Sequence, residues 1–524
     1  MLLPTTIALV LYHLLPSAFD LHDHLAKWPP VEVPDFHPDD LVRLLNLVAE
    51  LPASNRKLAK KARKHGGYVP ISSKLAQAMV RYYNHYLAYA VRTGILETDM
   101  RWWPALEGVE GKCQGYRFAP AYCASQQPGA GARMQLVRLT DPKRIAKAKL
   151  QARTPDRQTE TEKRARRVRE YRHEHLLQWL GPQTPLRIDQ DAAMAYIGER
   201  LTYLEQHPEE GRKKRLGWKA KWVKETDWEH YISPVEQHTQ RQHSIMRLAS
   251  QELRPSIDTT AGRLHTTLTN MSGELRQFVT VEGYGPLESI DLVNSQPYLA
   301  NVLLNPVFYR ETSQDQDFRR AASALSKAGR GIIKERRKSL KEGEGELGIM
   351  LVNLLQCSVS EDINKFSEFT SSGQFYEELA REFAAQGETT LQTRSALKEL
   401  VFQVLFTKNR YGSASKRAFR TLFPTVDQVF RILKKDDHST LARLLQTLEA
   451  YLFLHIIGKR VTRELPSVPV FTIHDSLVVP QEYADRVEAI MREELILAVG
   501  LPPTLKREVW GVLRSTVEGL AVAA

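Results

Sequence analysis

The sequence predicts a helix-rich α+β fold, and three observations support this prediction. Most of the chain has apolar residues three or four positions apart, which is the spacing of amphipathic helices. Two stretches, 287–299 and 471–480, instead indicate strands, and the second is rich in β-branched and aromatic residues. The chain has 524 residues, of which 42% are apolar. It can therefore bury a large core, and about two to four domains are expected.

The charge of the chain indicates its kind of partner. There are 73 Lys and Arg against 61 Asp and Glu, which gives a net charge of +12. Because the acidic count is ordinary, this is an excess of cations, and it favours a polyanionic partner such as nucleic acid. A basic enzyme that binds no polyanion is the alternative on charge alone.

The cysteines and the start of the chain indicate the compartment. Cys113, Cys123 and Cys357 form neither a disulfide framework nor a CxxC metal site, so a reducing, cytoplasmic compartment is expected. The apolar start lacks a positive segment and is interrupted by Pro4 and Pro16, which favours a buried helix over a cleaved signal. No uninterrupted apolar run is long enough to span a membrane, so no membrane partner is expected.

Residues 1–125 are expected to form a mostly helical domain. Leu51-Pro52 is expected to end its first helix, and a later helix is expected to run from about Ser72 to Arg92. The predicted elements are helices at 39–51, after Ser54 and at 72–92, then strand-like pieces at 95–98 and 116–120. Three helices and a hairpin are typical of a winged helix, a DNA-binding form; a plain helical domain is the alternative.

The next segments are a linker and a basic region. Residues 126–160 are rich in Gly, Gln, Pro, Ser and Thr and are expected to form a linker. Residues 161–255 contain two basic runs, at 160–174 and 211–224. In the second run Trp218 and Trp222 are four apart, so they can pack a helix whose Lys residues face a phosphate backbone. A solvated charged face is the alternative for both runs.

Two aspartates at predicted strand ends are candidates for catalysis. Asp475 lies at the tip of the predicted hairpin 471–480, and Asp291 ends a strand that turns into a helix. Two carboxylates from separate strand ends are what a two-metal phosphoryl-transfer site requires. The alternative for Asp291 is that it merely caps the following helix.

A second candidate element is a predicted helix that carries two cations followed by two aromatic rings on one face; these four residues are called the stripe. Arg394, Lys398, Phe402 and Phe406 are each four apart, so they lie on one helical face. The cations can hold phosphates and the rings can stack under a base and a sugar. Alternatively, the two Phe residues belong to the core and the cations to a solvated face.

These features occur in an order that resembles a known family. The chain shows Gly262-Arg263 with Asn270, then Asp291, the R-x3-K-x3-F-x3-F helix, Phe423-Pro424, Gln446 and His474-Asp475. Over residues 250–515 this resembles the palm and fingers of family A DNA polymerases, whose relatives include single-subunit phage RNA polymerases. The resemblance covers about half of the chain.

The resemblance implies a right-hand polymerase with an antiparallel-sheet palm and helical fingers and thumb. The implied segments are a thumb-like region at 161–255, palm at 256–304, fingers at 305–435 and palm again at 436–524. Asp291 and Asp475 would hold two Mg²⁺ ions, or Mn²⁺ in their place. The partners would be nucleoside triphosphates and a DNA primer-template, with RNA as an alternative.

The resemblance also implies a role for each further site residue. Arg394 and Lys398 would bind the triphosphate, Phe402 would pack against its sugar and base, and Phe406 would lie under the templating position. The remaining site residues are Gln296 for the nucleotide, and Arg263, Asn270, Gln446 and His474 for the primer-template.

Three departures from the family leave the activity open. Gln296 stands where the family has Glu, Phe406 where the DNA polymerases have Tyr, and Ser476 where Glu follows His-Asp. The family's Glu and Tyr exclude the ribose 2′-hydroxyl, so ribonucleotides are expected to be candidates as well. A primase-like RNA-synthesising enzyme, a template-independent nucleotidyltransferase and an inactive nucleic-acid-binding homologue are alternatives. The pathway, such as replication of a mobile element, repair or defence, is also open.

Overall fold

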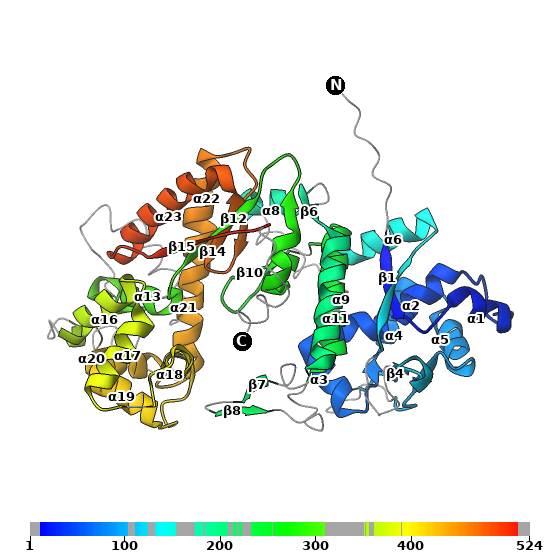
Figure 1. Cartoon of the computed structure of the whole chain (residues 1–524), viewed down its shortest axis with the longest axis horizontal. Coiled ribbons are helices and arrows are strands. Elements are labelled where there is room, and N and C mark those ends of the chain that lie inside the picture. Colours follow the sequence, from blue (N-terminus) through cyan, green and yellow to red (C-terminus); the bar gives the residue numbers. More distant parts are fainter. Residues whose placement is uncertain are drawn as a thin grey trace.

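The computed structural model describes residues 11–511 with internal gaps (Figure 1). The gaps are 103–110, 124–131, 154–172, 182–183, 208–212, 217–218, 223–231, 254, 310–350, 352, 356–360 and 389. Several predicted features lie outside the described residues. They are the first ten residues of the apolar start, most of the basic run 160–174, Trp218 and Cys357.

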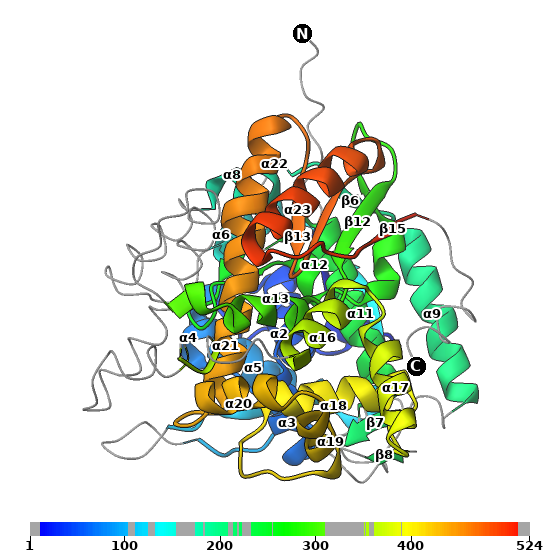
Figure 2. The same cartoon turned by 90° about the vertical axis from the view of Figure 1, so that its left-hand side faces the viewer.

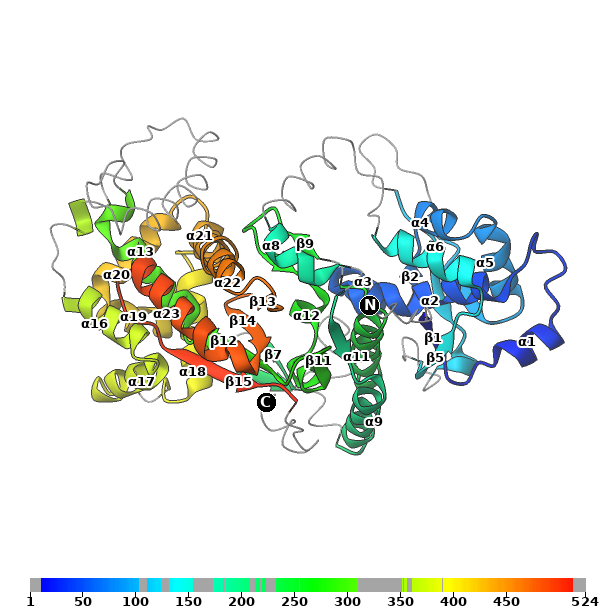
Figure 3. The same ribbon diagram turned by 90° about the horizontal axis from the view of Figure 1, so that it is seen from above.

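The described residues form a helix-rich α+β structure with small antiparallel sheets. Two large apolar cores account for it, one built from residues 11–145 and the other from residues 176–510. Figures 1 and 3 show the two parts at opposite ends, with α9 (Gln190–Gln206) and α11 (Pro234–Ala249) between them. No helix among the described residues is long and apolar enough to cross a membrane.

The N-terminal part packs short helices against a three-stranded sheet of order β2-β4-β3. Its strands are β2 (Val69–Pro70), β3 (Leu96–Thr98) and β4 (Gly115–Phe118). Its helices are α1 (Leu21–Lys27), α2 (Pro38–Ser54), α3 (Arg56–Lys64), α4 (Ser73–Met79) and α5 (Tyr83–Arg92).

Two helix boundaries in this part differ from the prediction. Pro52 does not end the first helix, because α2 continues to Ser54; a proline near a helix end costs only the hydrogen bond that its missing N–H would have made. The predicted helix 72–92 is broken into α4 and α5 at Val80. The backbone of Val80 is extended there, and its side chain is buried in the core.

Two further segments of the N-terminal half adopt strands that the sequence did not indicate. The apolar start contains β1 (Tyr12–Pro16) where a helix was expected. It pairs with β5 (Met134–Arg138), which lies with α6 (Pro142–Arg153) inside the predicted linker 126–160. The two strands satisfy each other's backbone groups across a long sequence separation, which local patterns do not report.

The basic run at 211–224 is a hairpin and not the expected helix. Strand β7 (Lys213–Leu216) pairs with β8 (Lys219–Trp222) across a two-residue connection. The pairing of these two strands excludes the helix that the spacing of Trp218 and Trp222 suggested.

The C-terminal part is built on a four-stranded antiparallel sheet of order β13-β14-β12-β15. The hairpin predicted at 471–480 is confirmed as β13 (Phe471–Ile473) and β14 (Ser476–Pro480). Strand β12 (Leu287–Leu292) lies between β14 and β15 (Leu505–Val509). Arg507 on β15 forms a two-pronged ion pair with the buried Glu288 of β12, which joins the two strands.

Helices surround this sheet, and one of them, α21 (Ser439–Tyr451), joins the sheet to the helices at the other end of the C-terminal part. Figures 1 and 2 show α21 running from α18 (Arg394–Phe406) and α20 (Pro424–Leu433) to the sheet. The predicted helix break at Phe423-Pro424 is confirmed between α19 (Ala414–Leu422) and α20. The other helices are α8 (Glu174–Leu177), α12 (Thr267–Asn270), α13 (Ser295–Leu304), α16 (Glu361–Ser371), α17 (Phe375–Ala385), α22 (Gly458–Glu464) and α23 (Ala484–Val499).

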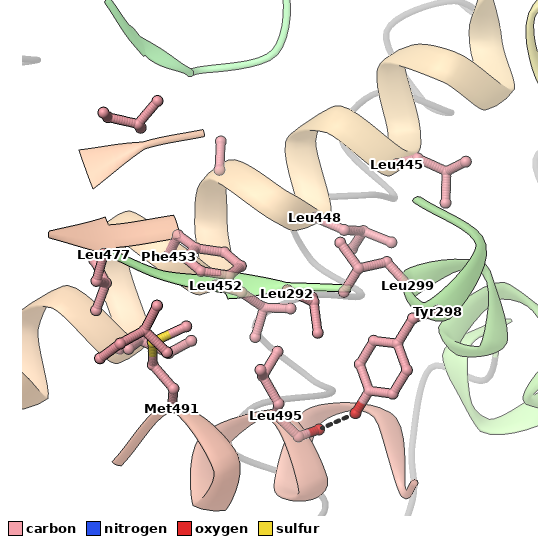
Figure 4. Close-up of a cluster of buried hydrophobic side chains, with 14 of the residues drawn as sticks. Leu292, Tyr298, Leu299, Leu445, Leu448, Leu452, Phe453, Leu477, Met491 and Leu495 are labelled. Atoms are coloured by element: carbon pink, nitrogen blue, oxygen red, sulfur yellow. Dashed lines mark hydrogen bonds between the residues drawn. The ribbon is translucent and has the colours of Figure 1, made fainter. Parts of the chain in front are cut away.

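A cluster of buried side chains fixes the position of β12 (Figure 4). Leu292 at the end of β12 packs among residues of α21 and α23, including Leu448 and Leu495. The hydroxyl of Tyr298, at the start of α13, donates a hydrogen bond to the carbonyl oxygen of Leu501 at 2.6 Å. Strand β12 and the helix that follows it are therefore held from both sides, so the end of the strand has a defined position.

Candidate active site

The sheet brings Asp291 and Asp475 together, although they are 184 positions apart in the sequence. Asp291 pairs with Ser476 across β12 and β14, so it lies beside the tip of the β13–β14 hairpin. Next to this pair, the Leu292 N–H donates to the carbonyl oxygen of Asp475 at 3.2 Å. The two carboxylates predicted from the strand ends therefore share one place on the sheet.

The electrostatics of Asp291 show the effect of this proximity. Burial and then the negative charge of Asp475 raise the pKa of Asp291 to about 7. The cations of Lys506, which faces Asp291 from β15, and of Arg276 act in the opposite direction. Two adjacent acidic groups with too little compensating charge form a site that favours a bound cation.

The backbone on both sides of the carboxylates is in a left-handed conformation that non-glycine residues rarely adopt. His474 has φ of 56° and Asn294 has φ of 55°. Such residues cost free energy and gather at functional sites. Buried polar atoms without a hydrogen-bond partner occur here too: Asn294 Nδ2, Gln296 Oε1 and His474 Nδ1. Unsatisfied buried atoms of this kind mark places where a ligand, an ion or water completes the bonding.

Glu449 is a site residue that was not predicted. It lies on α21 with 2% of its side chain exposed. One of its carboxylate oxygens is 2.7 Å from Nη2 of Arg263, and the other accepts a hydrogen bond from the amide of Gln296. Burial raises the pKa of Glu449 to about 7; Arg263 opposes this rise, and the charge of Asp475 adds to it. Glu449 therefore joins two predicted site residues to the carboxylate site.

A signal for Glu449 was present in the sequence. It is the one acidic residue in the apolar run 441–457. A carboxylate in a helix that is otherwise apolar is buried, and a buried charge needs a partner or a function. The partner lies on a distant loop, so its identity could not be inferred.

Arg263 reaches Glu449 from a tight turn between β9 (Ser256–Ile257) and β10 (Leu264–His265). The carboxylate of Asp258 holds this turn by accepting hydrogen bonds from three backbone N–H groups, one of them that of Arg263. Gly262 has φ of +75°, which favours glycine. The ring of His265 lies edge-on to that of His474, at 6.1 Å between centroids. Arg263, Gln296 and His474 thus lie together around the carboxylates.

Two predicted primer-template residues have other surroundings. Asn270 is exposed at the end of α12, and its amide donates to the carbonyl oxygen of Thr266 at 3.0 Å. Gln446 is half-buried on α21, three residues before Glu449 and one turn of helix away from it.

Three of the four residues of the predicted stripe lie on the exposed face of α18, and the fourth, Phe406, is partly buried and packs against the core. Arg394, Lys398 and Phe402 are exposed, with 57% of Phe402 accessible, while the opposite face is buried in the core. The rings of Phe402 and Phe406 lie 4.9 Å apart between centroids. Arg394 forms an ion pair with Glu377 and lies 5.3 Å from the centre of the Tyr376 ring. The alternative interpretation placed both Phe residues in the core. Phe402 contradicts it because it is exposed, whereas Phe406 agrees with it in part because it packs against the core.

The stripe and the carboxylates lie toward opposite ends of α21 (Figures 1 and 2). Among the described residues, no hydrogen bond or ion pair joins Arg394 or Lys398 to Asp291 or Asp475. The structure thus brings Asp291 and Asp475 together at the sheet with the side chains around them, and it places the stripe residues separately on α18.

Comparison with known proteins gives limited similarity. No family model matches the chain, and no curated protein sequence matches it. Among solved structures, the chain is similar to the POL domain of Pol1 from M. smegmatis, solved in complex with DNA primer-template and dNTP. The identity is 12%, the TM-score is 0.29, and the match covers 65% of this chain and 69% of that one. We base no conclusion on a similarity this low.

We expect Asp291→Asn to stabilise the metal-free protein more at high pH than at low pH. The folded protein holds the Asp291 proton up to about pH 7, whereas the unfolded chain releases it near its ordinary pKa of 3.8. The free energy of unfolding of the wild type therefore falls as the pH rises through this window. In EDTA, the advantage of the variant over the wild type should be about 2–3 kcal/mol larger at about pH 8 than at about pH 5, because each pH unit in the window is worth about 1.4 kcal/mol. An equal difference at both pH values would contradict the raised pKa.

Proposed function

We propose that the chain is a template-dependent nucleic acid polymerase that transfers nucleotides to a primer 3′-hydroxyl by two-metal chemistry. The single observation that carries the proposal is the proximity of Asp291 and Asp475 on neighbouring strands. In this reaction the 3′-oxygen forms a bond to the α-phosphorus of a nucleoside triphosphate. The bond from that phosphorus to the bridging oxygen breaks, pyrophosphate leaves, and the hydroxyl proton goes to solvent.

The residues present fit divalent cations of the Mg²⁺ kind. Asp291 and Asp475 offer carboxylate oxygens, and Mg²⁺ is commonly held by one or two carboxylates together with substrate phosphates and water. The described residues contain no cluster of three or more His, Cys, Asp or Glu side chains suited to a metal, so the substrate would supply the remaining ligands. When bound, the ions would activate the 3′-hydroxyl and neutralise charge on the leaving pyrophosphate. Mn²⁺ suits the same oxygen ligands.

The exposed face of α18 would take the triphosphate, as the resemblance to family A polymerases implies. Lys398 is exposed, and it forms no hydrogen bond or ion pair with the residues that the structure describes. Arg394 would exchange Glu377 for phosphate oxygens; both partners are about half exposed, and such a pair contributes at most about 1 kcal/mol. Because α18 lies away from the sheet, a nucleotide would have to span the space between them or draw α18 toward it. Phe402 would stack on the nucleotide, and Phe406 would lie under the templating base.

Gln296 is the residue that we propose for contact with the sugar. Its amide N–H₂ donates to Glu449, so its Oε1 is left as a buried acceptor without a partner. A ribose 2′-hydroxyl is a donor that could satisfy this acceptor. We therefore propose that ribonucleotides are accepted beside deoxynucleotides, and that Glu449 acts as a positioning residue that fixes the orientation of Gln296.

Primer extension tests the proposed function. With Mg²⁺ or Mn²⁺, the wild type should extend a primer according to its template, and Asp475→Asn should lower the rate by at least about a hundredfold, because the loss of a metal ligand removes several kcal/mol of transition-state stabilisation. Lys398→Ala should mainly raise the KM for the triphosphate. Lys408→Ala, at an exposed lysine just after α18, is the matched control and should leave KM unchanged. Extension that ignores the template would indicate a template-independent transferase, and no extension by the wild type with either metal would indicate an inactive homologue.

Glu449→Gln tests the role of Glu449 in sugar choice. The substitution keeps the shape but removes the charged acceptor that orients the Gln296 amide. The ratio of kcat/KM for ribonucleotides to that for deoxynucleotides should fall about tenfold, the value of one hydrogen bond. Glu368→Gln, an exposed glutamate on α16, is the control. A ratio equal to that of the wild type, with the overall rate lowered, would leave Glu449 as a structural residue and contradict the proposed role.

A further inference from the structure

The N-terminal part contains a compact unit whose order of elements is that of a helix-turn-helix with a following hairpin. Along the chain come α2, α3, β2, α4, α5, β3 and β4, and the sheet order is β2-β4-β3. Helices α4 and α5 are joined by three residues, 80–82, which is the length of the turn in DNA-binding helix-turn-helix units. A plain helical domain, the alternative that the sequence left open, would not contain this sheet.

The unit has its own packing, which holds α5 in a fixed orientation. Helix α2 contacts both α4 and α5, and α5 contacts β3. Val80 in the turn and Tyr86 and Leu87 on α5 are buried in the same core as Leu96 and Phe118 of the sheet. The opposite side of α4 and α5 is therefore a rigid surface and not a mobile one.

That opposite side is exposed and cationic. Its exposed residues follow helical spacing from α4 through the turn into α5: Lys74, Gln77, Arg81, Asn84, His85 and Ala88. Neither helix nor the turn between them contains an acidic residue, and Lys74 and Arg81 are exposed cations on this side. Six further Lys and Arg lie on α3; of these Arg63 pairs with Glu236, and Arg92 at the end of α5 pairs with Glu32. An exposed helical face with cations and no acidic residue of its own complements a polyanion.

The base of the β3–β4 connection adds an exposed aromatic residue. The carboxylate of Asp99 accepts hydrogen bonds from the backbone N–H groups of Arg101 at 3.1 Å and Gly115 at 2.8 Å, which fixes this base. A Cβ on Gly115 would come within 3.1 Å of Asp99 and 3.0 Å of Tyr68, so the close approach depends on glycine. Arg101 is exposed next to Trp102, of which 63% is accessible.

We propose that residues 38–118 are a docking module for double-helical DNA, separate from the carboxylate site. Helix α5 would enter the major groove, where Asn84 and His85 in its first turn reach base edges and Lys74 and Arg81 contact phosphates. Arg101 and Trp102 would contact the neighbouring backbone. DNA is favoured over double-stranded RNA as the partner, because the major groove of B-form DNA admits a helix and the major groove of A-form RNA is too narrow.

This role goes beyond the proposed polymerase activity. The module and the carboxylate site belong to different cores, and α9 and α11 lie between them (Figure 3). A duplex held by α5 would keep the enzyme on a DNA molecule, or on a preferred sequence in it, while the carboxylate site works elsewhere.

The test compares two double variants of the full-length chain that remove the same charge. Lys74→Ala/Arg81→Ala removes the two proposed phosphate contacts, and Arg138→Ala/Lys147→Ala removes two exposed cations on β5 and α6. Binding of a blunt DNA duplex of about three helical turns is measured by fluorescence anisotropy at several salt concentrations. The first variant should lower the slope of log K against log salt by about two, at about 0.9 per phosphate contact, and the second should match the wild type.

Three further results decide the proposal. The Lys74→Ala/Arg81→Ala variant should retain primer extension at saturating primer-template, whereas Asp291→Asn should lose extension and keep duplex binding, so the two proposals can fail separately. Equal slopes for both double variants would overturn the docking module. Two results would overturn the choice of DNA and show a general anion surface. One is that the wild type binds double-stranded RNA as tightly as the DNA duplex. The other is that Lys74→Ala/Arg81→Ala weakens binding to phosphatidylserine vesicles as much as it weakens binding to DNA. Circular dichroism verifies that both variants are folded.

Discussion

The structure depends on the contact between β12 and β14 that places two carboxylates side by side. Asp291 is partly buried beside Asp475, and the raised pKa of Asp291 shows that its ionised form is unfavourable there. Such an arrangement destabilises the metal-free fold, and the apolar cluster around Leu292 and Tyr298 holds the strands in register against it. This opposition between packing and electrostatics is typical of sites that bind a cation and its substrate.

Around this contact the chain gathers segments that are far apart in the sequence. Arg263 comes from a glycine turn, Gln296 from the first turn of α13 and Glu449 from α21, and the three side chains meet. Glu449 shares α21 with the residues that pack against α18, so one helix connects the sheet to the cationic stripe. Helix α21 therefore contacts both α18, which is proposed to bind the triphosphate, and the elements that hold the carboxylates.

Much of this arrangement could be predicted from the sequence, because the relevant signals are local. The β-branched and aromatic residues of 471–480 indicated the hairpin with Asp475 at its tip, and the spacing of four from Arg394 to Phe406 indicated one face of a helix. The predictions that were wrong concern pairing over long distances, as in β1 with β5, or local competition, as in the β7–β8 hairpin. Glu449 was missed because its partners, Arg263 and Gln296, are contributed by tertiary structure. The distance from α18 to the sheet is likewise a property of packing that spacing does not report.

Divalent-cation binding tests the central claim most directly, because it measures what the paired carboxylates are proposed to do. Titration of Mn²⁺ into the protein with a nucleoside triphosphate, followed by electron paramagnetic resonance, counts the bound ions. With one triphosphate bound, the wild type should hold two ions, one more than the triphosphate binds in the absence of protein, and should hold them at least about tenfold more tightly than Asp291→Asn and Asp475→Asn do. If both variants bind Mn²⁺ with the number and affinity of the wild type, the two carboxylates do not form a metal site and the proposed function fails.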